Sequence, residues 1–376
     1  MDMDTTLLAK AARTAIIDCL GLTEGETFLI VTNPGTEQAL IAQALKDEAD
    51  KAGIQTTLLF QPIKTQTDYA EPYVLDAISQ CPDAFASISA EKLGKDPEHV
   101  KNPLIASDGI SYDHIFHYLL HGTKQMRAFW SPGITLDMFL RTVSIDYSLM
   151  RTRAQILSQL LTDAEAVHIA APSGTDISFS ISGRNAFIDD GDFSKPGSGG
   201  NLPAGEVFIS PALRSAEGSI VFDGSIANIA GDIIIKTPIS CSVSGGFVLG
   251  AEGGKEAEQL EAALQTGMNM AARLVHEKGM DPEKALQYGI NARHIGELGI
   301  GLNTEARITG NMLEDEKVYS TCHFAIGSNY DEDAPAMIHL DGLVQQPTIT
   351  LLMKDCRELT IMKQGELVDF SNRPDY

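Results

Sequence analysis

The first 160 residues alternate between short apolar runs and longer stretches in which apolar residues recur with helical spacing. The segment Thr27–Thr32 is mostly apolar and is followed by Asn33-Pro34-Gly35, so it predicts a buried strand that ends in a turn. Residues 37–52 then have the spacing of an amphipathic helix. Because helices and strands keep alternating, the pattern predicts an α/β domain with an open parallel sheet covered by helices. The remaining elements predicted there are a helix at residues 7–20 and strands at 56–60, 84–88 and 127–131.

A long helix at residues 135–161 is predicted to close this first domain, which spans residues 1–162. The composition then changes, because residues 165–252 are rich in Gly, Ser, Ile and Val in short alternating runs. Such alternation is typical of strands with one face in a core. After a clear helix at residues 255–278, strand-like segments return, so residues 163–376 predict an α+β domain rich in antiparallel strands. Its first strands are predicted at residues 166–171, 176–181, 206–210, 219–223 and within 232–248.

Composition limits the classes of partner. With 28 basic and 51 acidic residues the formal net charge is −23, and such a surface repels nucleic-acid phosphates and anionic membranes. The five cysteines include no Cys-x-x-Cys pair, which argues against a disulfide framework and a zinc knuckle. An acidic N-terminus and the lack of a long apolar run predict a cytoplasmic protein without a signal peptide or membrane span. The turn at residues 33–36 lacks the glycine pattern of nucleotide-binding loops, so no nucleotide site is expected there.

The sharpest candidate for chemistry is a histidine and a carboxylate two residues apart. Residues 335–342 have the composition of a strand, and side chains at positions i and i+2 share one face of a strand. His339 and Asp341 are therefore expected to point the same way. Imidazole and carboxylate together suit zinc, cobalt, manganese or iron(II). Most such triplets are ordinary surface pairs, so this pair alone does not establish a metal site.

Three other segments carry residues of the ligand type. One contains His323 and Tyr330, which would otherwise be a core histidine and a packing tyrosine. A second contains His294 and Glu297 among several glycines, which let other atoms approach the backbone closely. In the third, Glu206 opens a predicted strand after a Gly/Pro turn, where site residues are frequent and where a merely solvated acid is the ordinary alternative.

In their order along the chain, these segments resemble the aminopeptidase T and aminopeptidase S family of metallopeptidases. The similarity covers nearly the whole chain, and its motifs include SPGITLDMFLR, NLPAGEVFISP, HIGELGIGLNTEARITGNMLEDEK, HFAIGSNY and HLDG. The resemblance implies a two-domain fold, a homodimer and two divalent metal ions, which would be zinc, cobalt or manganese. The metal ligands that it implies are Glu206, Glu297, His323, His339 and Asp341, with Tyr330 nearby.

The activity implied by this resemblance is metal-assisted hydrolysis of an amide bond in a small molecule or short peptide. Two metal ions that share a water can lower its pKa and polarise the scissile carbonyl. Glu206, or Glu297 if it coordinates only loosely, would pass the proton to the leaving nitrogen. Tyr330 would donate a hydrogen bond to the oxyanion.

The same superfamily includes the 2,5-dihydroxypyridine dioxygenases, which suggests a different activity. Their motif His-Ile-Gly-Trp-Gly-Leu-Asn resembles the segment that starts at His294, and their His-Leu-Asp resembles the segment at His339. This resemblance implies a ring-cleaving enzyme in which one iron(II) is held by two histidines and a carboxylate, here His294, His339 and Asp341.

Strand parity distinguishes the two schemes. If residues 293–303 form a strand, Glu297 shares a polar, open face with Gly299 and Gly301, whereas His294 shares an apolar face. This parity favours Glu297 as the ligand and therefore favours the hydrolase. The argument fails if the segment begins in a loop, so the dioxygenase stays an alternative, as does a binding protein without catalysis.

Two further segments are expected to lie outside the site. His114, His117 and His121 have helical spacing but no convincing acid or cysteine to complete a metal face, so a polar helix face or a domain interface is expected. The charged residues 313–317, Leu-Glu-Asp-Glu-Lys, are expected to form a solvated turn.

Overall fold

The computed structural model describes residues 5–65 and 67–369 and falls into two compact units. Unit 1 comprises Met1–Ser148 and Asp189–Ala204, and unit 2 comprises Leu149–Ile188 and Gly205–Tyr376. This division differs from the single boundary that was expected after residue 162. The helix before that boundary belongs to unit 2, and a later segment of the chain returns to unit 1.

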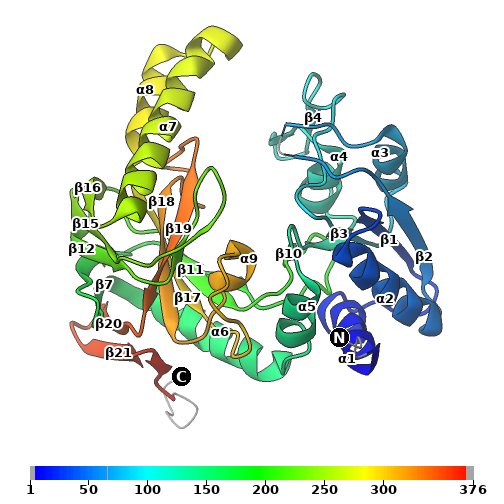
Figure 1. The fold of residues 1–376 in the computed structure, drawn as a ribbon, viewed down its shortest axis with the longest axis horizontal. Helices are drawn as coiled ribbons and strands as arrows, with labels where there is room; N and C mark the ends of the chain where they lie inside the picture. The colour runs from blue at the N-terminus through cyan, green and yellow to red at the C-terminus, as the bar shows by residue number, and fades with distance from the viewer. Residues whose placement is uncertain (1–4, 66, 370–376) are drawn as a thin grey trace. The chain divides into compact units, whose positions relative to one another are not determined.

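Unit 1 is built on a five-stranded parallel sheet with the order β10-β6-β3-β1-β2. Strand β1 (Thr27–Thr32) is buried beyond its first residue, as expected for a parallel strand covered on both faces. Helix α2 (Glu37–Lys51) packs on β1 and on β2 (Gln55–Phe60), so the predicted parallel α/β domain is confirmed (Figure 1). The other elements of unit 1 are α1 (Thr5–Arg13), the π-helix η1 (Thr14–Cys19), α3 (Pro72–Ser79), β3 (Ala84–Ile88), β4 (Leu104–Ile105), β5 (Ser111–Tyr112), α4 (Ile115–His117), the π-helix η2 (Tyr118–Gly122), β6 (Arg127–Trp130), α5 (Leu136–Thr142) and β10 (Gly199–Asn201).

The single helix predicted at residues 135–161 is wrong, because the structure has two helices there. Helix α5 ends at Thr142, and α6 (Tyr147–Asp163) begins after four intervening residues. Between them, the Asp146 Oδ1 atom accepts a hydrogen bond from the backbone N–H of Ser148 at 3.0 Å. A short acidic side chain that binds a free N–H in this way is a helix start signal, and the apolar spacing across it concealed the break.

Unit 2 contains a seven-stranded sheet in the order β14-β13-β19-β18-β17-β11-β9 and an eight-stranded antiparallel sheet in the order β16-β15-β12-β8-β7-β20-β21-β22. Strand β15 (Ile239–Ser244) illustrates the pattern that folds them, because Ile239, Cys241 and Val243 are buried while the serines between them are exposed. The predicted antiparallel-rich second domain is therefore confirmed (Figure 1).

Two helices that follow residue 252 in the sequence of unit 2 pack against each other. Helix α7 (Lys255–Lys278) has the predicted bounds and ends at Gly279, whose positive φ of 64° suits a glycine. Helix α8 (Pro282–Asn291) was not predicted, although Pro282 at its start and Asp281 as its cap are both helix start signals. The other elements of unit 2 are α6, β7 (Ala164–Ala170), β8 (Asp176–Ser180), β9 (Phe187–Asp189), β11 (Glu206–Ile209), β12 (Glu217–Phe222), β13 (Ser225–Ile226), β14 (Ile233–Ile234), β16 (Phe247–Glu252), β17 (Ile295–Gly301), α9 (Met312–Asp315), β18 (Thr321–Gly327), β19 (His339–Gln345), β20 (Thr348–Met353), β21 (Glu358–Lys363) and β22 (Glu366–Leu367).

No helix within residues 5–65 and 67–369 combines the length and the apolar character that crossing a bilayer requires.

Candidate metal centre

Four neighbouring strands of the seven-stranded sheet bring the predicted ligands together. Along the order β19-β18-β17-β11, Ala325 of β18 lies opposite both Asp341 and Glu297, and Gly301 lies opposite Glu206. The ligand-type side chains on these strands therefore lie close together, although their residues are far apart in the sequence. The five predicted residues that these strands carry are Glu206, Glu297, His323, His339 and Asp341.

These five residues form two overlapping triads, within each of which the candidate ligand atoms lie within 4.8 Å of one another. Glu206, Glu297 and His323 make the first triad, and Glu297, His339 and Asp341 make the second. Glu297 belongs to both, because its Oε1 atom lies 3.2 Å from His323 Nε2 and its Oε2 atom lies 3.5 Å from His339 Nε2. Four of the five residues are buried, and the His339 side chain is about a quarter exposed.

The backbone around His339 sets the orientation of its imidazole. Its Nδ1 atom lies 2.9 Å from the carbonyl oxygen of Ser328, which can only accept, so Nδ1 carries the proton. The Nε2 atom then faces the cluster, 3.2 Å from Asp341 Oδ1. A ring that donates one N–H to a carbonyl and keeps the other nitrogen free is the usual arrangement of a metal-binding histidine.

Gly299 makes the space that the His323 ring occupies. A Cβ atom added at Gly299 would lie 2.0 Å from His323 Nε2 and 2.1 Å from Cε1, which is far inside van der Waals contact. The face of β17 that carries Glu297 and Gly299 thus faces the cluster, as strand parity predicted. Side chains alternate regularly between the two faces of β17 only from Glu297 onwards, because a β-bulge lies between Ile295 and Glu297.

Replacing Gly299 with alanine is expected to displace the His323 ring and to lower any activity of this site about 10²-fold, because ångström-scale misplacement has that order of effect. Metal content and turnover of the purified variant measure the effect. Gly250→Ala is the matched control, since its added Cβ meets no atom closer than 4.0 Å. If Gly299→Ala binds metal and turns over like the control, the His323 ring is not part of the site.

The charges of the cluster favour a cation. Burial alone would lower the pKa of both histidines, but the surrounding carboxylates outweigh it and raise the pKa of His323 to about 9 and that of His339 to about 10. Two oxygen atoms that face His339, Glu297 Oε2 and Asp341 Oδ1, are buried and have no hydrogen bond to the described residues. Buried carboxylate oxygens need a positive partner, so this set of oxygen and nitrogen donors fits divalent metal ions.

Lys317 is a residue of this cluster that the sequence analysis missed. It is 1% exposed, and its Nζ atom donates to Glu206 Oε1 at 2.5 Å and lies 2.8 Å from Glu316 Oε1. Burial raises the pKa of Glu316, and the positive charge of Lys317 partly opposes this rise. The cluster therefore contains one built-in cation beside its carboxylates.

The expectation of a solvated turn at residues 313–317 is wrong, because this segment is mostly buried. The Asp315 carboxylate accepts hydrogen bonds from the backbone N–H groups of Thr309 and Gly310 at 2.7 and 2.9 Å and from the Ser225 hydroxyl at 2.6 Å. These donors offset the cost of burying the charge.

Tyr330 lies beside the cluster, as expected. Its ring centroid is 5.6 Å from that of His339 and 4.8 Å from that of Phe208, and Phe187 stacks on Phe208 at 5.2 Å. Burial, followed by the charges of nearby carboxylates such as Glu297, raises the pKa of the Tyr330 hydroxyl, so the group stays protonated and can donate a hydrogen bond. Although the Tyr330 hydroxyl is desolvated beside the carboxylates, Tyr330 as a whole residue is exposed, as is Phe187, so this aromatic wall is open to a ligand.

His294 does not join either triad. It precedes β17, its ring packs edge-on against Phe247 at 5.4 Å, and neither of its ring nitrogens has a hydrogen bond to the described residues. Burial lowers the pKa of His294 to about 4, so its imidazole is neutral. The ligand set of His294, His339 and Asp341 is therefore not assembled in this structure.

Comparisons with known proteins found one relative by sequence and two solved structures with the same fold. A 2,5-dihydroxypyridine 5,6-dioxygenase from Pseudomonas putida KT2440 is 30% identical over 171 residues, which are 44% of this chain and only 41% of that protein. Two solved structures share the fold over 97% of this chain. A 2,5-dihydroxypyridine dioxygenase from P. putida KT2440 has a TM-score of 0.68, 17% identity and 98% of its own chain covered. AmpT from Thermus thermophilus has a TM-score of 0.64, 16% identity and 99% covered.

Both structural likenesses establish the fold alone. The sequence match is more specific. The family model described as NicX, 2,5-dihydroxypyridine 5,6-dioxygenase, matches residues 135–351, which is more than half of the 376 residues. The chain therefore belongs to the NicX family.

Proposed function

We propose that this protein is a metal-dependent hydrolase that cleaves an amide bond in a small molecule or short peptide. In this proposal two divalent cations, zinc, cobalt or manganese, are held by the two triads. The observation that carries it is the position of Glu297, which is shared by both triads and can therefore bridge two cations. One mononuclear site would leave Glu206 and His323 as buried ligand-type residues without a role.

The chain's own residues supply the remaining chemistry. Bound cations would act as Lewis acids on a carbonyl and would make water a better nucleophile near neutral pH. The Glu206 carboxylate can accept a proton and return it to the leaving nitrogen, while Lys317 holds it in place. The protonated Tyr330 hydroxyl can stabilise the developing oxyanion. The aromatic wall of Phe187, Phe208 and Tyr330 suits a substrate with an apolar or aromatic group.

A ring-cleaving dioxygenase is the second candidate, and the family match and the named relative favour it. The motif His-Ile-Gly-Trp-Gly-Leu-Asn also fits residues 297–303, Glu-Leu-Gly-Ile-Gly-Leu-Asn, without a gap. That alignment keeps Gly299, Gly301, Leu302 and Asn303 and places Glu297 at the motif's histidine. With a carboxylate at this position, the three matched ligands are one histidine and two carboxylates instead of two histidines and one carboxylate. Such a set suits iron(II) oxygenases less well. We therefore place the hydrolase first.

Metal analysis combined with two assays distinguishes the candidates. The purified protein is expected to bind two zinc, cobalt or manganese ions per chain and to hydrolyse amino-acid nitroanilides, without consuming oxygen when 2,5-dihydroxypyridine is added. One iron per chain together with oxygen uptake on 2,5-dihydroxypyridine would replace the hydrolase with the dioxygenase. If no metal binds after each ion is supplied, both proposals are wrong.

A further inference from the structure

Unit 1 contains a pocket of about 560 Å³ that has no part in the proposed chemistry. It lies where parallel strands β3, β6 and β10 end, since Ser87 and Ser89, Trp130, and Asn201 come from the carboxyl ends of these strands or just beyond them. In open parallel sheets, the carboxyl ends of the strands are the usual place for a ligand. The volume suits a small organic molecule.

Several aromatic rings line this pocket. The Trp130 ring meets the Phe116 ring edge-on, with centroids 5.8 Å apart, and the His117 ring lies 5.1 Å from Phe116. Burial, followed by the neighbouring His114 and His121, lowers the pKa of His117 to about 4, so His117 presents a neutral ring. Such a surface favours a flat, aromatic ligand.

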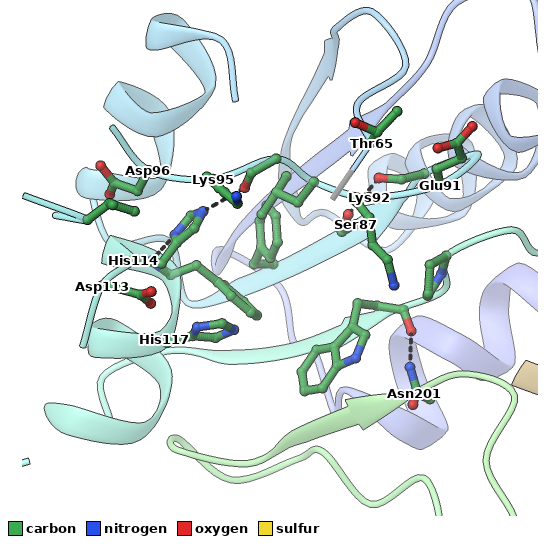
Figure 2. A pocket seen from close by; sticks show the side chains of 18 residues that line it. Thr65, Ser87, Glu91, Lys92, Lys95, Asp96, Asp113, His114, His117 and Asn201 are labelled. Atoms are coloured by element: carbon green, nitrogen blue, oxygen red, sulfur yellow. Dashed lines mark hydrogen bonds between the residues drawn. The ribbon is translucent and has the colours of Figure 1, made fainter. Parts of the chain in front are cut away.

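The polar groups inside the pocket favour an anion. Lys92 is exposed, no described residue forms an ion pair with its ammonium group, and Figure 2 shows its side chain entering the pocket on the side of Asn201. The buried hydroxyls of Ser87 and Ser89 also line the pocket, 2.8 Å from each other, and the one that accepts in this hydrogen bond can donate to a ligand.

The acids that line the pocket do not cancel this preference. Asp96 is buried and already accepts hydrogen bonds from the His99 ring at 2.5 Å and from the backbone N–H of Ile115 at 3.1 Å. Glu91 and Asp113 are exposed, and Figure 2 shows their carboxylates at the margins of the pocket, away from Lys92. The His114 ring is not available to a ligand either, because both of its nitrogens already form hydrogen bonds with the backbone, at Phe116 and at Gly94.

We propose that this pocket binds a small planar aromatic carboxylate, with the ring between His117 and Trp130 and the carboxylate at Lys92. The side-chain N–H of Asn201 donates a hydrogen bond to the Trp130 carbonyl oxygen at 3.1 Å, which fixes Asn201 beside Trp130. The pocket shares no residue with the metal centre, because every lining residue belongs to unit 1. A test of this pocket is therefore independent of a test of the proposed hydrolase activity.

Trp130 is the single tryptophan of the chain, so its fluorescence reports directly on this pocket. Titration of the full-length protein with benzoate is expected to change the fluorescence in a saturable way, and neutral benzyl alcohol is expected to bind more weakly. Lys92→Met is expected to weaken benzoate about tenfold, because one charge-assisted contact is lost, whereas Lys92→Arg keeps it.

Two controls make this test specific. Lys101→Met removes an exposed lysine of the same unit outside the pocket and is expected to leave benzoate binding unchanged. Asp341→Asn alters the metal centre and is also expected to leave the Trp130 signal unchanged. The proposal is overturned if benzoate gives no saturable signal, if benzyl alcohol binds equally well, or if Lys92→Met binds benzoate like the wild type.

Discussion

Replacing Glu297 with alanine is expected to lower amide hydrolysis by about 10³-fold, which corresponds to roughly 4 kcal/mol of transition-state stabilisation. The effect is large because Glu297 contacts both His323 and His339 and is the one residue common to the two triads. Its loss would remove a ligand from both of the proposed cations at once. Metal content per chain and kcat/KM on the same preparation measure the two consequences together.

His294→Ala is the matched comparison, because His294 is also buried and lies three residues away, but outside both triads. This variant is expected to keep its metal content and most of its activity, and to lose stability only through the cavity that it leaves beside Phe247. The opposite result, with His294→Ala inactive and Glu297→Ala fully active, would contradict the hydrolase and support the iron-binding scheme.

Local patterns in the sequence predicted several strands and the orientation of one residue of the candidate site. Residues 27–32 and 84–88 are strands with the predicted bounds, because an apolar run between turn residues has few other solutions. The side of β17 on which Glu297 lies was predicted from its spacing to Gly299, and the close approach of His323 to that glycine agrees. The alternation of faces along a strand could not predict the direction of the His294 side chain, because His294 lies before β17 and a β-bulge follows Ile295.

Contacts between distant segments could not be predicted from local pattern. Lys317 and Glu206 are 111 positions apart, and nothing near either residue in the sequence indicates that they meet. A run of charges predicts solvent exposure unless its partners are known, and the partners of Asp315 are backbone N–H groups and Ser225. The convergence of Glu206 and His323 was expected only through the resemblance to a known family.

Replacing Lys317 with methionine is expected to lower the free energy of unfolding of the metal-free protein by about 3–5 kcal/mol, the usual cost of removing one partner from a buried ion pair. The carboxylates of Glu206 and Glu316 then lose a cation 2.5 and 2.8 Å away. Urea denaturation in the presence of a chelator measures this difference. Lys354→Met, which removes an exposed lysine in a turn, is the control and is expected to change stability little.

The same pair of variants tests whether the cluster is a metal centre. Divalent cations bound to Glu206 and its neighbours supply the positive charge that Lys317→Met removes, so the loss of stability is expected to shrink when zinc or manganese is present. A lysine that acts only as packing gives the same loss with and without metal, because methionine fills a similar volume in both states. Equal losses in the two conditions would therefore count against cations at this cluster, whereas a loss confined to the chelated protein would support cation binding beside Lys317.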